Sequence, residues 1–166
     1  NFEIRPFQYR ETRLDSIRGA LLLTHSELQL DSLVGYINGE QSRIEGRIGL
    51  QHSATRPVYF SRSSQIAVQS QGKNLSLELL QPLLPAKGTI NGLINYVVKI
   101  NGRLGKPKIK GAAEISKGSF SFNPGDPGFE SITLNITFQD SLFKIKPLQA
   151  SYHKTPFQLD GEFITI

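Results

Sequence analysis

The side chains that could act as catalysts or metal ligands are few and widely scattered. His25, His52 and His153 lie far apart, and no His-x-x-x-His spacing is present to hold a metal ion. The chain has no cysteine, which excludes thiol catalysis, disulfides and cysteine–zinc sites. No Gly-x-Ser-x-Gly elbow presents a serine nucleophile. The sequence therefore predicts no metal site and no cofactor, and surface positions are favoured for the histidines.

Two further patterns invite a chemical interpretation. Asp126 and Glu130 flank a Pro/Gly loop and could serve as a glycosidase carboxylate pair, but a solvated turn is the favoured interpretation. Residues 102–106, Gly-Arg-Leu-Gly-Lys, faintly resemble a phosphate-binding loop. Pro107 stands where that loop needs Ser or Thr for magnesium, and no helix is predicted to follow. We therefore predict that the protein is not an enzyme.

The net charge is +5, from 19 Lys and Arg against 14 Asp and Glu. Five of the cations gather in one short segment: Lys99, Arg103, Lys106, Lys108 and Lys110. They could contact nucleic-acid phosphates or anionic lipid headgroups. No nucleic-acid motif is present, and the aromatic residues fall on the apolar face rather than between the cations. We predict no nucleic-acid partner. Edge protection or solubility is the favoured role of these cations, and headgroup contact comes second.

Apolar and polar residues alternate with a period of two along most of the chain, which is typical of half-buried strands. The clearest runs are Ile94/Tyr96/Val98/Ile100, Ile109/Gly111/Ala113/Ile115 and Ile132/Leu134/Ile136/Phe138. Weaker runs are Ile44/Gly46/Ile48/Leu50, Leu75/Leu77/Leu79, Phe143/Ile145 and Phe157/Leu159/Gly161/Phe163. Strands with one apolar and one polar face predict an antiparallel sheet, because the strands of a parallel sheet covered on both faces would be apolar throughout.

The connections complete an all-β prediction. The only expected helical turn is Leu79 to Leu84, whose leucines could plug one end of the sheet. Turn chemistry marks 38–39, 71–74 and 124–128, and the phase shift across Gly118 predicts a bulge. We expect roughly ten strands in a meander, forming a single domain over 1–166. The longest apolar run, Ala20 to Leu23, is far too short to span a bilayer.

Residues 97–122 carry a family resemblance. A strand ends in Gly102, a linker contains Pro107, and Gly111 and Gly118 precede an aromatic strand with Phe120 and Phe122. This pattern resembles the C-terminal region of the TamB family, within the AsmA-like group of bridge-like lipid transfer proteins. Residues 159–163 resemble the closing strand of the same unit, and residues 44–48 and 75–85 resemble its earlier part.

The resemblance implies a curved antiparallel sheet, a β-taco or half-pipe, with an apolar inner groove. It implies a periplasmic location in the cell envelope of double-membraned bacteria, in a parent protein anchored in the inner membrane. It also implies phospholipid transfer between the inner and outer membranes and a link to outer-membrane protein assembly through a TamA-like β-barrel partner. Because the chain starts at Asn1 and lacks Met, we expect a fragment of such a parent. The inner-membrane anchor and the TamA-like partner are therefore expected only of the parent protein.

In this interpretation the partners of the groove are phospholipid acyl chains. The residues expected to line it are Ile94, Tyr96, Val98, Ile100, Ile109, Ile115, Phe120, Phe122, Ile132, Leu134, Ile136, Phe138 and Phe163. Alternation by itself favours a different outcome, in which the same residues fill a closed β-sandwich. The resemblance favours the groove. A third hypothesis is a module that binds an acidic polysaccharide through its Lys/Arg face.

Overall fold

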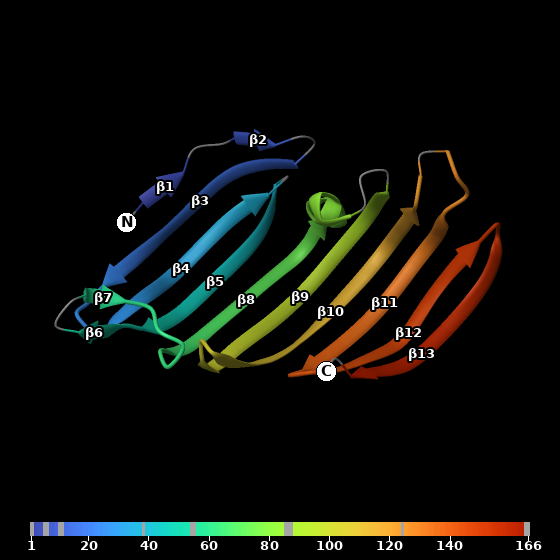
Figure 1. Cartoon of the computed structure of the whole chain (residues 1–166). Coiled ribbons are helices and arrows are strands. Elements are labelled where there is room, and N and C mark those ends of the chain that lie inside the picture. Colours follow the sequence, from blue (N-terminus) through green and yellow to red (C-terminus); the bar gives the residue numbers. More distant parts are fainter. Residues whose placement is uncertain are drawn as a thin grey trace.

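The alternating runs form strands of one antiparallel sheet in the computed structural model, which describes residues 2–4, 7–9, 12–37, 39–53, 56–84, 88–123 and 125–164. Within these residues eleven strands share the sheet. The nine long strands follow one another in chain order: β3 (Thr12–Leu23), β4 (Glu27–Ile37), β5 (Glu40–Gly49), β8 (Gln65–Ser76), β9 (Thr89–Arg103), β10 (Lys106–Ser121), β11 (Phe129–Gln139), β12 (Leu142–Tyr152) and β13 (Thr155–Ile164) (Figure 1).

The remaining elements are short. Strands β1 (Phe2–Ile4) and β2 (Phe7–Tyr9) both pair with the outer edge of β3. Strands β6 (Gln51–Ser53) and β7 (Arg56–Tyr59) make a separate two-stranded hairpin at one end of β5. A 3-10 helix, η1 (Leu77–Leu83), links β8 to β9.

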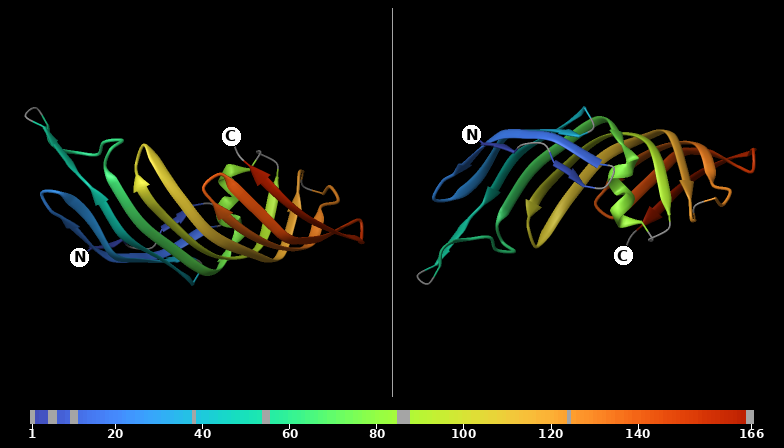
Figure 2. Two further views of the ribbon diagram at one scale, coloured as in Figure 1. Left: turned by 90° about the horizontal axis from the view of Figure 1, so that it is seen from below. Right: turned by 90° about the horizontal axis from the view of Figure 1, so that it is seen from above.

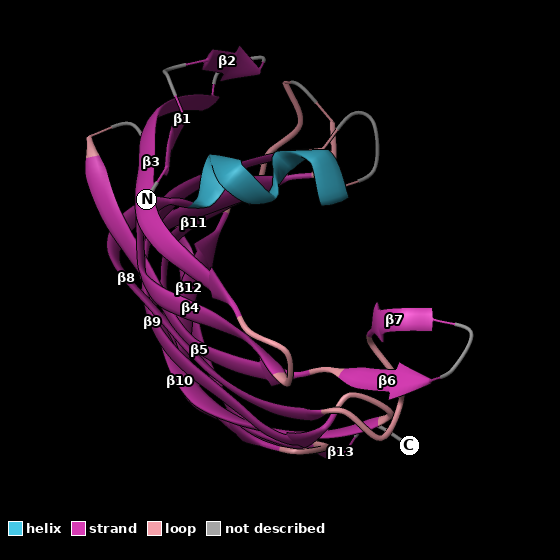
Figure 3. Cartoon of the chain, turned by 90° about the vertical axis from the view of Figure 1, so that its left-hand side faces the viewer, coloured by secondary structure: helices cyan, strands magenta, loops and turns pink. Residues whose placement is uncertain are grey.

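The sheet is curved and does not close into a barrel. Figure 2 shows the long strands side by side in a single layer. Figure 3 looks along the row of strands, and each strand bends into an arc, so that the sheet forms a trough running from β3 to β13. The expected all-β, curved antiparallel sheet with one short helical turn is therefore confirmed. In the described residues the long strands form one open layer, so the closed sandwich does not describe this fold.

A bulge in β10 shifts the pairing, as the phase change across Gly118 predicts. Ser116 pairs with Leu93, but the next pair joins Ser119 to Asn91, so β10 holds one more residue than β9 over this stretch. Lys117 has a positive φ of 53°, and Gly92 opposite has a φ of 128°. The extra residue returns Phe120 to the same face as Ile115.

Two predictions about the β8 region are wrong. Residues 71–74 lie inside β8 rather than in a turn, with Gln71 paired to Val97 and Gly72 to Tyr96. The expected strand Leu75/Leu77/Leu79 ends at Ser76, and the helical turn begins earlier than expected, at Leu77. The Ser76 hydroxyl caps it by accepting from the Glu78 amide at 3.2 Å.

The protein exposes far more surface than a closed domain of its size. Its accessible surface is 11356 Å², whereas a compact monomer of 18.5 kDa is expected to expose about 8,200 Å². Four apolar residues are buried within the described part of the chain: Leu50, Leu75, Leu77 and Ala150. Most other strand residues on the apolar face are only half-buried. The reason is geometric, because one curved layer has no second sheet to cover that face.

Candidate functional site: the apolar concave face

The position of η1 identifies which face of the sheet is concave. Figure 3 places η1 inside the arc of the strands, at one lip of the trough. Leu77 at its start is buried, and a Cβ built on Gly92 of β9 would lie 3.1 Å from its Cδ1. Because alternate residues of a strand share a face, Ile94 and Tyr96 lie on the concave side with Gly92. The apolar runs predicted from the sequence therefore face inward.

The strand register aligns these inward residues in rows across the sheet. One row joins Leu75, Ile94, Ile115, Leu134, Leu148 and Leu159. The next joins Gly72, Tyr96, Ala113, Ile136, Ile145 and Gly161. A third joins Ser70, Val98, Gly111, Phe138, Phe143 and Phe163. A fourth, shorter row joins Val68, Ile100 and Ile109. Three rows cross the six strands β8 to β13 and the fourth crosses three, and apart from Ser70, three glycines and the Tyr96 hydroxyl their side chains are hydrocarbon.

Aromatic rings and glycines shape the floor of the trough. Phe138 and Phe143 stack with their ring centroids 5.8 Å apart. Phe138 lies over Gly111, where an added Cβ would come within 2.6 Å of its Cζ and also collide with the backbone oxygen of Val97. A side chain at Gly111 would therefore displace the ring, which gives this glycine of the family-like pattern a packing role.

One polar cluster interrupts the apolar lining. The Tyr96 hydroxyl lies 2.9 Å from Ser42 Oγ and 3.1 Å from Ser70 Oγ, so the ring reaches over Gly72 toward β5. A Cβ on Gly72 would lie 2.7 Å from Tyr96 Cε1. These hydrogen bonds hold the ring across the floor and satisfy its polar end, so Tyr96 presents mainly hydrocarbon to the trough.

The structure places the predicted lining residues with two qualifications. Phe122 lies past the end of β10 and is 62% exposed, with its ring edge-on to Phe120 at 4.8 Å between centroids. Phe163 pairs with Phe143 in β13, but its side chain lies outside the described residues. The other eleven predicted residues are half-buried in β9, β10 and β11: Ile94, Tyr96, Val98, Ile100, Ile109, Ile115, Phe120, Ile132, Leu134, Ile136 and Phe138.

The prediction missed the contribution of β8 and β12. Phe143, Ile145 and Leu148 continue the rows of β11, and Val68 continues those of β9. Alternation with Lys144 and Lys146 was the available signal for Phe143 and Ile145. No local signal marks Leu148, because a register shift between Ile145 and Leu148 breaks the period of two.

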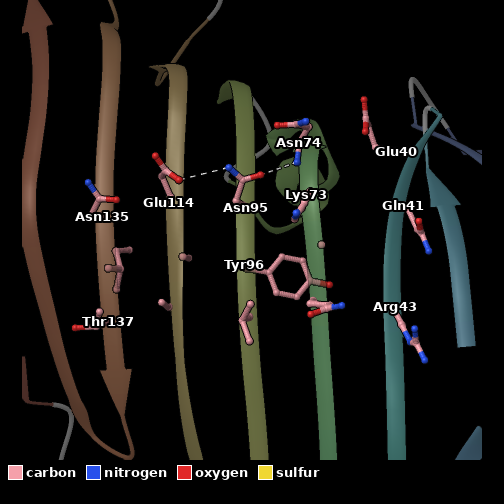
Figure 4. Close-up of a pocket in the computed structure, with 16 residues that line it drawn as sticks. Glu40, Gln41, Arg43, Lys73, Asn74, Asn95, Tyr96, Glu114, Asn135 and Thr137 are labelled. Carbon is pink, nitrogen blue, oxygen red and sulfur yellow. Dashed lines mark hydrogen bonds between the residues drawn. The ribbon is translucent and has the colours of Figure 1, made fainter. Parts of the chain in front are cut away.

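The convex face is polar and carries its own hollow. A hollow of about 1060 Å³ lies on this side, and Figure 4 shows side chains that line it, among them Arg43, Asn95, Glu114 and Thr137. Asn95 accepts a hydrogen bond from the Asn74 amide at 2.8 Å and donates to Glu114 at 3.5 Å. Its lining contains no histidine but does include Tyr96 and Ile136 of the predicted site, whose apolar rows lie on the concave side.

Electrostatic features of the described chain are modest. The Lys144 ammonium hydrogen-bonds the exposed Glu162 carboxylate at 2.8 Å and lowers the pKa of that carboxyl. Among the described residues, no group of three or more His, Asp or Glu is placed to hold a metal ion. No helix in the same residues is long and apolar enough to cross a bilayer.

Comparisons with protein-family models, curated proteins and solved structures found no match to this chain. The structure therefore defines an architecture and not a family: an open antiparallel half-pipe with an apolar concave face. The likeness to the TamB family stays a prediction from the sequence pattern.

Proposed function

We propose that the concave face of the sheet is a groove for the acyl chains of phospholipids and guides them between the inner and outer membranes of the cell envelope. The protein acts without catalysis in this proposal. The TamA-like partner, the periplasmic location and the inner-membrane anchor of a longer parent protein belong to the same proposal and rest on the sequence resemblance.

The observation that carries the proposal is an apolar face left uncovered. Rows of Ile, Leu, Val and Phe cross the concave side, yet most of their members are half-buried rather than buried. The exposed apolar surface of a monomer usually marks a binding site when it is contiguous over hundreds of square ångströms. A trough that runs across the strands, lined by hydrocarbon and open along its length, fits a long flexible hydrocarbon guest better than a compact ligand.

The physical basis of transfer is the cost of wetting an acyl chain. Each CH₂ group removed from water contributes about 0.8 kcal/mol, so a chain of about a dozen carbons cannot cross water unaided at a useful rate. A continuous apolar floor removes most of that barrier at every step, since neighbouring rows offer similar contacts. The charged headgroup stays in water at the open side. Many residues share the contact, and we expect no single one to be indispensable.

The test is photocrosslinking from the floor of the trough. A photoreactive phenylalanine analogue replaces Phe138 or Phe143, whose rings face the concave side and whose shape the analogue conserves. The protein is made in a double-membraned bacterium, irradiated, purified and analysed by mass spectrometry. We expect phospholipid attached at both positions.

Matched controls come from the opposite face of the sheet, one of them in the probed strand β11 and the other in β9. Gln139 is adjacent to Phe138 in β11 and exposed, and Asn95 is adjacent to Tyr96 and lines the convex hollow. The analogue at either position should capture no phospholipid above background. Equal labelling of both faces, or none on the concave face, would refute the groove.

A further inference from the structure

The convex face of β9 and β10 carries the five cations noted in the sequence. Lys99, Arg103, Lys106, Lys108 and Lys110 are all exposed. They alternate with Ile100 and Ile109, which occupy concave rows, so the cations lie on the opposite, convex face. The strand pairing thus concentrates the positive charge of this segment on one side of two adjacent strands.

Like charges stand directly opposite each other in this cluster. Lys99 pairs with Lys110, and Arg103 pairs with Lys106. Directly opposed side chains have Cβ atoms about 5 Å apart, and like charges at that spacing destabilise a sheet. The outer neighbours of the first pair are the neutral Gln69 and Gln139. The fold alone therefore offers no compensation in this row.

Two cations elsewhere on the same sheet are paired with acids. Arg43 lies 3.1 Å from Glu45, and Lys144 lies 2.8 Å from Glu162. Asp140, in the turn between β11 and β12, accepts a hydrogen bond from the Ile109 amide at its Oδ1, at 3.1 Å. Within the described residues, neither Lys99 nor Lys110 forms an ion pair with a carboxylate.

A hollow lies next to the opposed lysines. It has a volume of about 590 Å³, and its lining includes the cations Lys99, Lys110 and Lys144 together with the apolar residues Val97, Ala112, Phe138 and Leu142. Ala112, which pairs with Val97 in the row beside the two lysines, and Gly111 also line this hollow. Thr137 and Gln139 add neutral hydrogen-bonding groups at the border.

We propose that this convex hollow binds a phosphate group, held chiefly by Lys99 and Lys110. A phosphate would neutralise the opposed ammonium groups and accept charge-assisted hydrogen bonds from both. The phosphate can belong to a free organic phosphate or to a lipid headgroup, because both present the same anionic oxygens. The site lies on the opposite face from the acyl-chain groove and does not depend on it.

The first measurement is a titration of the whole chain with inorganic phosphate and with glycerol 3-phosphate. Amide shifts are followed by ¹⁵N NMR at constant ionic strength, and we expect saturable shifts at Lys99, Lys110 and Thr137. The second measurement is co-sedimentation with vesicles of phosphatidylcholine, with or without phosphatidylglycerol. Binding of the free phosphates assigns a soluble ligand, whereas binding only to the anionic vesicles assigns a headgroup.

The variant Lys99→Gln/Lys110→Gln should weaken whichever binding is seen by about tenfold or more, since each charge-assisted hydrogen bond typically contributes at least a factor of that order. The matched control is Arg43→Gln/Arg47→Gln, which also removes two positive charges, here from the convex face of β5, and should change affinity by less than about twofold. The Tm of the lysine variant should be unchanged or higher, because the repulsion between the opposed charges is removed. The single variant Lys110→Gln provides a second test should the double variant fold poorly.

Two results would overturn the proposal. One is the absence of saturable binding to either phosphate source. The other is an equal loss of binding in the lysine and arginine variants, which would reveal attraction to net charge rather than a site. Failure of the photocrosslinking test at Phe138 would leave these results unaffected.

Discussion

The placement of Tyr96 across the groove floor makes Gly72→Ala a sharp test of the structure. A Cβ at position 72 would lie 2.7 Å from Tyr96 Cε1 and 2.6 Å from Leu75 Cδ1, well inside van der Waals contact. The Tyr96 ring must move, and its hydrogen bonds to Ser42 and Ser70 would stretch or break. The effect is expected on the free energy of unfolding rather than on the overall fold.

The magnitude follows from three contributions. Overpacking of this kind costs about 1–3 kcal/mol. Weakening two hydrogen bonds adds about 1 kcal/mol. The loss of backbone freedom in the unfolded chain offsets about 0.4–1 kcal/mol. We therefore expect Gly72→Ala to lower the free energy of unfolding by about 2 kcal/mol, and Tm by roughly 4–8 °C for a chain of this size.

Urea unfolding followed by circular dichroism measures this change, and Gly35→Ala is the matched control. Gly35 lies in β4, and its added Cβ would meet only Ile17 Cγ1 at 3.9 Å, an ordinary contact. That variant should be neutral or slightly stabilising. In a Tyr96→Ala background the cost of Gly72→Ala should fall by about 1 kcal/mol. Equal stabilities of the two glycine variants, or full additivity with Tyr96→Ala, would refute the described packing.

Two further outcomes concern η1 and the C-terminal hairpin. Gln81 donates a hydrogen bond to the Gly88 carbonyl and accepts one from the Ile90 amide at 3.2 Å. Gln81→Leu should therefore lower the free energy of unfolding by about 2 kcal/mol and speed hydrogen exchange at the Ile90 amide. Unchanged exchange at Ile90 would contradict these two hydrogen bonds. The pKa of Glu162 is lowered by its hydrogen bond to Lys144, so the stabilisation is present above the ordinary pKa near 4.5 and is lost as pH falls through the lower folded value. Wild type should therefore lose stability relative to Glu162→Gln between about pH 5 and pH 3 in thermal unfolding scans, and parallel curves would count against the ion pair.

Local patterns predicted much of the strand content because period-two alternation is set by backbone geometry. The runs around Tyr96, Ile115 and Ile136 all lie in strands, and the phase break at Gly118 is a bulge. Residues 71–74 misled the prediction, since Gly and Asn are typical of turns. Gly72 instead makes room for a ring from the neighbouring strand. The turn propensity of these residues was outweighed by the packing of the Tyr96 ring over Gly72, a contact between strands that the local sequence does not reveal.

The sequence by itself determined which side chains share a face, because that depends only on alternation within a strand. Alternation also placed Lys99, Lys108 and Lys110 on the face opposite the apolar runs. Only the tertiary structure decided that the apolar face is the inside of a curved layer, and that no second sheet covers it in the described residues. Curvature and register arise from the sum of many strand pairings. The opposed pair of Lys99 and Lys110, and the ring of Phe138 over Gly111, therefore emerge only when the strands are assembled.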